Sequence, residues 1–382
     1  MAQSIIDIIE RYPEAIQKTV NLSFDMTSST GAKYKRGLID PAMRRFMPMT
    51  RYISARLAFR KVSDVKPTLA FIVGTDGEYP LRKEAVELSL EMVGSIKIAR
   101  ARLLTEEDFD LLREAELHLR ANEVEVYNQF VRGFLQEPAY LTQAVVSLCQ
   151  VLLAQLFSQG MCTYIDPETH LGFELSYINK IPATNRPLPL TGTQLWTDPV
   201  NSKPLENLRS HFDAYYKNVN TLPEVLGMPS AAGDAMLNAN DTRLKIARMK
   251  GFFFEVTPET IGSLPRPTVE DCRTWLSNEV TTAAQGGLTI PQFVVSDSFY
   301  YSEDANGNEI SVPYFSSDSY YFLNEGIMEG AYVPTATNDY ASTLAIITEV
   351  ISKAPKREKV SIDTRFLASC SDPRYLGWRK VI

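Results

Sequence analysis

The most regular pattern in the chain is a helical repeat of apolar positions over residues 105–134. Thr105 suits a helix N-cap, and the three acidic residues after it stabilise the positive end of a helix dipole. We predict a helix of about thirty residues that is interrupted by Pro138, followed by a second, more apolar helix that ends at Gly160. The apolar repeat comprises Phe109, Leu112, Leu119, Val126, Phe130 and Phe134.

The part of the chain before these helices is predicted to be extended. The first fifty residues alternate short apolar runs with Ser, Thr, Gly and Pro, which is typical of an arm whose order depends on contacts elsewhere. Strand-like runs at 51–59, 67–73 and 94–104, with a short amphipathic piece at 83–93, then indicate a long hairpin excursion.

After the helices, alternating apolar and polar positions predict further strands. Residues 161–178 form a strand, turn and strand, and 290–315 form a hairpin about Asn306-Gly307, a pair that supplies the positive φ angles of a tight turn. A strand follows at 319–324. The chain closes on 358–382, where two extended runs flank a turn.

Three further helices are predicted among these strands. They cover 205–219, with Pro204 just ahead, then 230–237, and finally 267–284 with Pro267 and Thr268 at its head. Helices and strands interleave without a regular β-α-β rhythm, so the predicted fold class is α+β.

Charge is unevenly distributed along the chain. Residues 31–61 hold nine Lys or Arg against Asp40 alone, so the remainder carries about −15 within a total of −7. A basic arm with aromatic residues suits either nucleic acid or an acidic neighbouring subunit. We favour the subunit, because no nucleic-acid-binding motif accompanies the arm.

The amino-acid composition indicates the broad class of protein to which the chain belongs. The 382 residues are 45% hydrophobic and 22% charged, as in an ordinary globular protein. We expect neither a secretory signal nor a membrane span, because the N-terminus is acidic and no run of eighteen apolar residues occurs. The four scattered cysteines, without a CxxC pair, are expected to be reduced, buried thiols in a cytosolic compartment.

Candidate chemistry is sparse. Asp304 begins a stretch that resembles a calcium loop, but its sixth and twelfth positions hold Glu309 and Phe315 instead of glycine and glutamate. No metal-ligand spacing and no common catalytic signature occurs, so we predict no catalytic residue, cofactor or metal. We expect the histidines to be surface or capping residues; they are His118, His170 and His211.

Two polar or aromatic clusters remain as candidate pockets. Asp166, Glu168 and His170 crowd one turn, which turn propensity explains more simply than a site does. Trp196 and the tyrosine pairs at 215–216, 300–301 and 320–321 are better explained by burial in strands or by subunit contacts.

The order of segments resembles the major capsid proteins of tailed bacteriophages, in particular the family of the lambda major head protein E, which has the Hong Kong 97 phage capsid fold. The likeness lies in a long helix ending at Gly160, the strand-turn-strand TYIDPETHLGFELSYI, and the segment GTQLWTDPVNSKPLENLRSHF. It continues through the hairpin and strand of 294–324 and the closing strands of 360–382.

The resemblance implies a division of the chain into named parts. The implied parts are an N-terminal arm (1–51), an extended loop over an adjacent subunit (52–104), a spine helix (105–160), a peripheral domain (161–189 and 357–382) and an axial domain (190–356).

The resemblance also implies a structural role without enzymatic activity. Hexamers and pentamers would form an icosahedral virion head around double-stranded DNA, assembled in the cytoplasm of a bacterial host. The expected partners are further copies of the chain, a decoration or cement protein, a scaffold, a portal, and packaged DNA through weak non-specific contact. The implied assembly-contact residues are Arg56, Arg60, Lys61, Lys66 and Trp196.

Two other classes of protein are weighed beside this one. An encapsulin-like nanocompartment shell around a cargo enzyme would have the same fold, and the contents of the particle separate the two. A hydrolase with an unrecognised site is disfavoured by the few histidines and the missing motifs.

Overall fold

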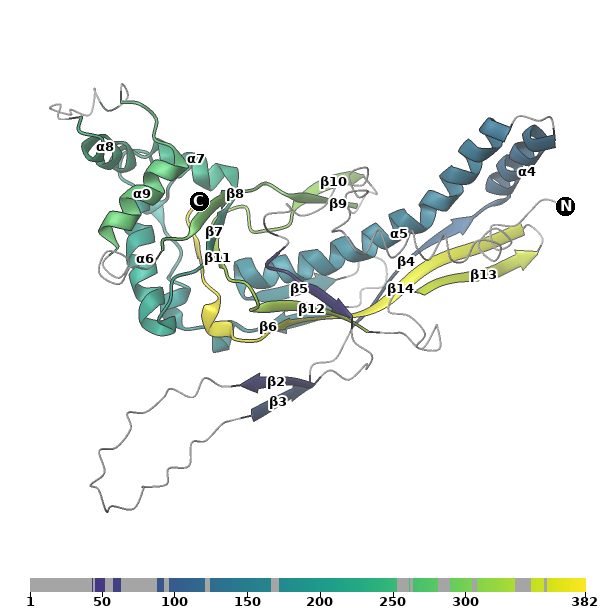
Figure 1. Ribbon diagram of the computed structural model, residues 1–382, viewed down its shortest axis with the longest axis horizontal. Helices are drawn as coiled ribbons and strands as arrows, with labels where there is room; N and C mark the ends of the chain where they lie inside the picture. Colours follow the sequence, from purple (N-terminus) through teal and green to yellow (C-terminus); the bar gives the residue numbers. More distant parts are fainter. Residues whose placement is uncertain are drawn as a thin grey trace, which may run out of the picture.

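The structure is a computed structural model of the 382-residue chain. It describes residues 43, 45–51, 58–62, 88–92, 96–120, 124–165, 172–252, 261, 264–280, 289–303, 308–333, 345–353 and 356–382. Helix α5 runs along much of the elongated body, with one sheet beneath it and a group of helices and strands at one end (Figure 1).

The first sheet is built on the long strand β14 (Lys356–Cys370). Strand β4 (Ile96–Leu104) pairs with it antiparallel along one edge, while β13 (Ala345–Lys353) and β12 (Met328–Val333) pair antiparallel with successive parts of the other edge. The short strand β1 (Met49–Arg51) lies parallel to β12.

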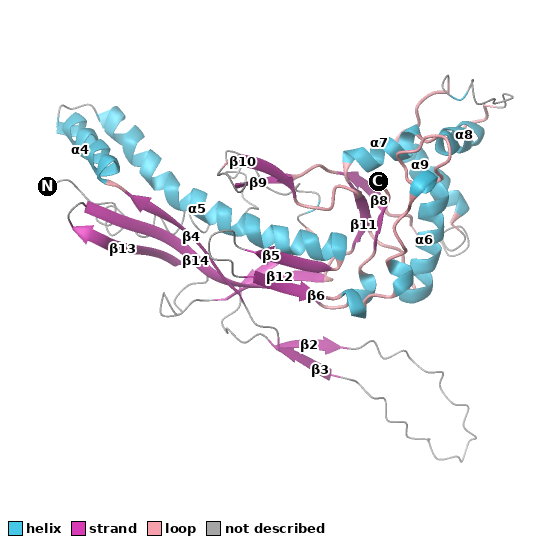
Figure 2. Ribbon diagram, turned by 180° about the vertical axis from the view of Figure 1, so that it is seen from behind, coloured by secondary structure: helices cyan, strands magenta, loops and turns pink. Residues whose placement is uncertain are grey.

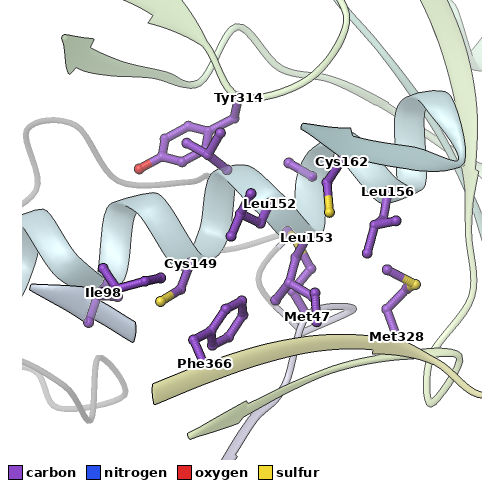
Figure 3. Packing of buried hydrophobic residues seen from close by; sticks show 14 of the residues in the cluster. Met47, Ile98, Cys149, Leu152, Leu153, Leu156, Cys162, Tyr314, Met328 and Phe366 are labelled. Atoms are coloured by element: carbon purple, nitrogen blue, oxygen red, sulfur yellow. The ribbon is translucent and has the colours of Figure 1, made fainter. Parts of the chain in front are cut away.

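The first hydrophobic core lies between this sheet and α5 (Val124–Gln159). Leu153 and Leu156 of α5 are fully buried and face Phe366 of β14 and Met328 of β12 (Figure 3). Gly330 permits this close approach, since a Cβ atom there would lie 2.8 Å from the Phe366 ring. Helix α4 (Glu106–Arg120) precedes α5 and packs beside it.

A second, four-stranded sheet has the order β15-β11-β7-β8 and is flanked by helices (Figure 2). Its strands are β15 (Trp378–Lys380), β11 (Ser319–Leu323), β7 (Val225–Met228) and β8 (Gln292–Val295). The helices are α6 (Pro204–Val219), α7 (Ser230–Asn238), α8 (Asn240–Met249) and α9 (Val269–Glu279). Short 3-10 helices are η2 (Ile178–Lys180), η3 (Ala183–Asn185), η4 (Gly192–Gln194) and η7 (Pro373–Tyr375).

The second sheet packs against a hydrophobic core on each of its two faces. All five side chains of β11 are buried, and they alternate: Tyr321 and Leu323 belong to the first core, while Tyr320 and Phe322 belong to the second. Successive side chains of a strand point to opposite faces, so one strand holds both cores together. The two ends of the body are therefore joined by packed side chains and not by a linker.

Three hairpins complete the described structure. Strands β9 (Phe299–Glu303) and β10 (Glu309–Pro313) pair antiparallel, as do β5 (Met161–Ile165) and β6 (Gly172–Ser176). The third hairpin consists of β2 (Ala58–Val62) and β3 (Leu88–Met92). The predicted Asn306-Gly307 turn lies outside the described residues.

Several sequence predictions need correction here. Pro138 does not end a helix, because α5 continues through it; the packing of 141–159 in the core outweighs the hydrogen bond that proline removes. Residues 292–295 form a separate strand beside β7 and are not part of the hairpin. Within the piece at 83–93, residues 88–92 form strand β3.

The two closing strands of the chain belong to different sheets. β14 pairs with β4, β12 and β13, whereas β15 pairs with β11. Strand pairing over such sequence separations leaves no trace in local periodicity. The last residues of the predicted arm likewise lie in the chain's own core, where Met43, Phe46 and Met47 are buried.

The cysteine prediction is confirmed for Cys149, Cys162 and Cys272, which are buried free thiols, while Cys370 is partly exposed. Among the described helices, the stretch Leu141–Gln159 is long and apolar enough to cross a membrane by length and composition. It is 72% buried inside the protein, as is usual for a helix in a core.

Candidate assembly surfaces

The hairpin β2–β3 stands clear of both cores (Figures 1 and 2). Ala58 pairs with Met92 and Val62 with Leu88, and among the described strands these two pair only with each other. An isolated two-stranded ribbon is marginally stable in water at best. Within the described residues, no further strand supports this hairpin.

The structure places only some of the implied contact residues. Arg60 and Lys61 lie on β2, whereas Arg56 and Lys66 lie outside the described residues. Trp196 does not fit the prediction, because its side chain is 1% exposed and its ring stacks on Tyr320 at 5.5 Å. It belongs to the second core, so it offers no surface to a neighbour.

Large apolar side chains are exposed in four places, one of which is Ile165 at the end of β5. Leu188 and Val200 lie in the segment between η3 and α6. A second set lies on β8, β9 and β10: Val295, Phe299, Tyr301 and Ile310. A third set is carried by β4, α4 and β13: Leu103, Leu111, Leu117, Val350 and Ile351. Single exposed apolar residues are common on protein surfaces, so exposure alone does not identify a contact.

A buried polar cluster fixes the C-terminal turn to the second core. The His211 ring lies 2.8 Å from the Tyr320 hydroxyl through Nδ1 and 3.1 Å from the Asn185 carbonyl through Nε2. Because a carbonyl only accepts, Nε2 carries the proton and Nδ1 accepts from the hydroxyl. Desolvation by burial lowers the pKa of His211 to about 3, so the ring is neutral. The prediction of a surface histidine was wrong at this position.

The same cluster continues toward η7. The Tyr215 hydroxyl donates to the Tyr375 carbonyl at 3.0 Å, and the Asn324 amide donates to that hydroxyl at 3.0 Å. Asn185 donates to the Arg374 carbonyl at 2.7 Å. These bonds clamp the chain where it passes from β14 to β15, and no local sequence pattern marks them.

The polar and aromatic candidates from the sequence are only partly covered by the described residues. They contain no group of three or more His, Cys, Asp or Glu side chains placed to hold a metal ion. The predicted polar turn with Asp166, Glu168 and His170 lies outside the described residues, as does Asp304. His118 lies on α4. Of the tyrosine pairs, Tyr215, Tyr320 and Tyr321 are buried in the cores, whereas Tyr301 is 45% exposed.

The fold as a whole is similar to that of a solved structure. That structure is the "putative capsid protein of prophage (E. coli CFT073)", which aligns with 96% of this chain and 98% of its own, at a TM-score of 0.54 and 11% identity. The chain has the Hong Kong 97 capsid fold. The α+β class predicted from the order of elements and the capsid fold implied by the resemblance are both confirmed.

Other solved structures align with this capsid fold more loosely. A phage-related protein from Bordetella bronchiseptica RB50 aligns with 95% of this chain and 96% of its own, at a TM-score of 0.46 and 12% identity. A chain of the procapsid of satellite phage P4 aligns with 97% and 99%, at 0.41 and 10%. No protein-family model matches the sequence, and no curated protein matches it.

Proposed function

We propose that this chain is a structural shell protein that assembles with copies of itself into a closed particle. The capsid fold over 96% of the chain supports this proposal. So does the hairpin β2–β3, which pairs with no other described strand of its own protomer. A subunit that leaves such an element without support is suited to an assembly in which a neighbour covers it.

The observed sheets suggest which part of the subunit would form which region of a shell. The extended loop would lie between β1 and β4, with α4 and α5 as the spine. The sheet on β14 would form the peripheral part. The second sheet, with helices α6 to α9, would form the axial part around the symmetry axes. Because β11 contributes side chains to both cores, the second sheet would keep these two parts in one orientation while the extended loop adapts to its neighbour.

The finer proposal is the head of a tailed phage that encloses double-stranded DNA, built from hexamers and pentamers in the bacterial cytoplasm. Its role would be structural, not enzymatic. A scaffold, a portal and a decoration protein would be its partners. The net charge of −7 favours a lumen that does not grip DNA, which would otherwise oppose packaging and ejection.

The test is assembly of the purified chain, alone and then with its genomic neighbours, followed by sedimentation and electron microscopy. We expect closed particles from the parent chain. Replacing 58–92 by a flexible glycine-serine linker should leave a folded protein, with an unchanged near-ultraviolet circular dichroism spectrum, that no longer forms particles. A parent chain that remains a small oligomer under every condition would refute the proposal. A lumen filled with a protein cargo would favour the nanocompartment instead of the phage head.

A further inference from the structure

Helix α4 holds acidic side chains that have no basic partner among the described residues. Glu106, Glu107, Asp110 and Glu114 are exposed, and within the described part of the chain none of them forms an ion pair. The carboxylates of the later helices α7, α8 and α9 each lie beside a basic side chain; they are Asp234, Asp241, Glu270, Asp271 and Glu279. The negative charge of α4 is therefore available to a partner.

The spacing of these carboxylates places most of them on one side of the helix. An α-helix turns by about 100° per residue, and Leu111 and Leu117 are 41% and 56% exposed. The helix dipole favours acidic residues in the first turn, but it does not account for Asp110 and Glu114, which lie further along. Within an arc of about 120° lie, in order, five side chains here named the acidic face, with Arg113 at its border: Leu117, Asp110, Glu114, Glu107 and Leu111.

The sequence contains a segment whose chemistry matches this face. Residues 33–39, KYKRGLI, hold Lys33, Lys35 and Arg36, no acidic residue, and apolar side chains among the cations. This basic segment lies outside the described residues. It fits a surface on which carboxylates lie between two leucines, because opposite charges meet and apolar areas are covered in the same contact.

The basic segment reaches a neighbouring copy more readily than it reaches α4 of its own chain. It precedes Met43, which is buried with Met47 in the first core, and Met47 faces Leu153 of α5 (Figure 3). α4 packs against α5 toward the other end of that helix, at Val124, which is about 44 Å from Leu153 along the axis (Figure 1). Lys33 precedes Met43 by ten residues, which span about 35 Å when fully extended. To lie on its own α4 the segment would have to run almost straight, whereas a second copy can present it from the side.

We propose that the acidic face of α4 binds the basic segment 33–39 of a neighbouring copy of this chain. The three cations pair with the carboxylates, while the apolar side chains of the segment cover the two exposed leucines. A single exposed ion pair contributes little, because water and salt screen it, so several pairs and the apolar flanks act together. This inference rests on the proposed shell function, since it names one contact between the subunits of that shell.

The first test reverses charge on the acidic face and measures the protein concentration at which particles appear. Asp110→Lys with Glu114→Lys should raise this threshold about tenfold, because attraction becomes repulsion, and the effect should shrink in about 0.5 M salt. Glu174→Lys with Glu325→Lys is the matched control: both carboxylates are exposed on other parts of the chain, and the net charge changes equally. The control should keep the threshold of the parent, and both variants should melt within about 3 °C of it.

A compensating substitution distinguishes a direct contact from a general effect of charge. Lys35→Glu with Arg36→Glu should by itself raise the threshold about tenfold. Combined in one chain with Asp110→Lys and Glu114→Lys, it restores opposite charges across the contact, so the threshold should return to within about threefold of the parent. The inference is overturned, while the shell function stands, if the parent assembles and the α4 variant keeps its threshold, or the control pair is equally disruptive, or the combined effects simply add.

Cross-linking identifies the occupant of the acidic face. A carbodiimide joins a lysine amine directly to a carboxylate with which it is in contact. Particles assembled from a mixture of unlabelled and isotope-labelled chains should yield peptides that join Lys33 or Lys35 to a carboxylate of the acidic face and carry one label from each kind of chain. Products that all come from single chains would overturn the choice of a neighbouring copy. A parent chain that never assembles would overturn the shell function and the inference with it.

Discussion

The buried histidine of the second core should make folding stability depend on pH. His211 is 1% exposed and donates through Nε2 to the Asn185 carbonyl. We consider the substitution His211→Gln, which keeps a polar side chain but removes the titrating ring. The amide can replace one of the two hydrogen bonds, so at pH 7.5 the variant should be less stable by about 1–2 kcal/mol.

The sign of the pH effect follows from where the proton binds. Desolvation lowers the pKa of His211 to about 3 in the folded chain, against about 6.5 when the chain is unfolded. Between these values the unfolded chain binds a proton that the folded chain does not, so the free energy of unfolding falls as the pH falls. From pH 7.5 to pH 5 this contribution amounts to a loss of about 2 kcal/mol in the parent and is absent in the variant.

The assay is urea denaturation at a series of pH values from 5 to 7.5, at a protein concentration below the assembly threshold. Tryptophan emission reports on the second core through Trp196 and Trp275. The stability deficit of His211→Gln should shrink by about 2 kcal/mol at pH 5, which cancels or reverses it. Tyr215→Phe is the matched control: it disturbs the same polar cluster without a group that titrates in this range, because burial raises the pKa of Tyr215. A pH-independent deficit for His211→Gln would refute the reasoning.

Three other predictions concern packing and reactivity. Gly377→Ala should lower the melting temperature and cost about 1–3 kcal/mol, since its Cβ would lie 2.5 Å from the Phe322 ring; an unchanged melting curve would contradict this. Leu153→Ala should cost about 2–5 kcal/mol in urea denaturation, whereas Leu103→Ala, at a 44% exposed position, should cost less than about 1; equal costs would contradict the placement of α5. In a thiol assay of the native chain at pH 8, the partly exposed Cys370 should react. Cys149, Cys162 and Cys272 should be protected, because burial raises the pKa of each thiol to about 12. Rapid reaction of any of these three would contradict the prediction.

Local pattern was sufficient to predict most elements of this fold. Helix α6 begins with the predicted Pro204, and α9 begins after Thr268, whose side chain forms a capping box with Asp271. These signals act over a few residues, so they can be found in a single sequence. α8 was missed because its charged and apolar residues are equally numerous and interspersed within a short segment.

Strand partners could not be predicted in the same way. β14 reads as one extended run, yet it pairs with strands that begin at residues 96, 328 and 345, and the chain then crosses into another sheet. Which strands pair is decided by the packing of both faces of a sheet, a property of the whole fold. The family resemblance gave the capsid fold correctly, while the pairing of strands within each sheet had to come from the structure.

The candidate contacts were the hardest part to predict, and Trp196 shows why. A tryptophan in an uncharged stretch is conspicuous in sequence, and aromatic residues are enriched both in cores and in interfaces. The structure resolves this ambiguity: the ring is buried against Tyr320, and the loop that it anchors carries Val200 outward. Leu188 and Val200, in the segment before α6, are exposed aliphatic side chains that composition does not distinguish from other loop residues. Their exposure follows from the folded backbone, so three-dimensional geometry is needed to find them.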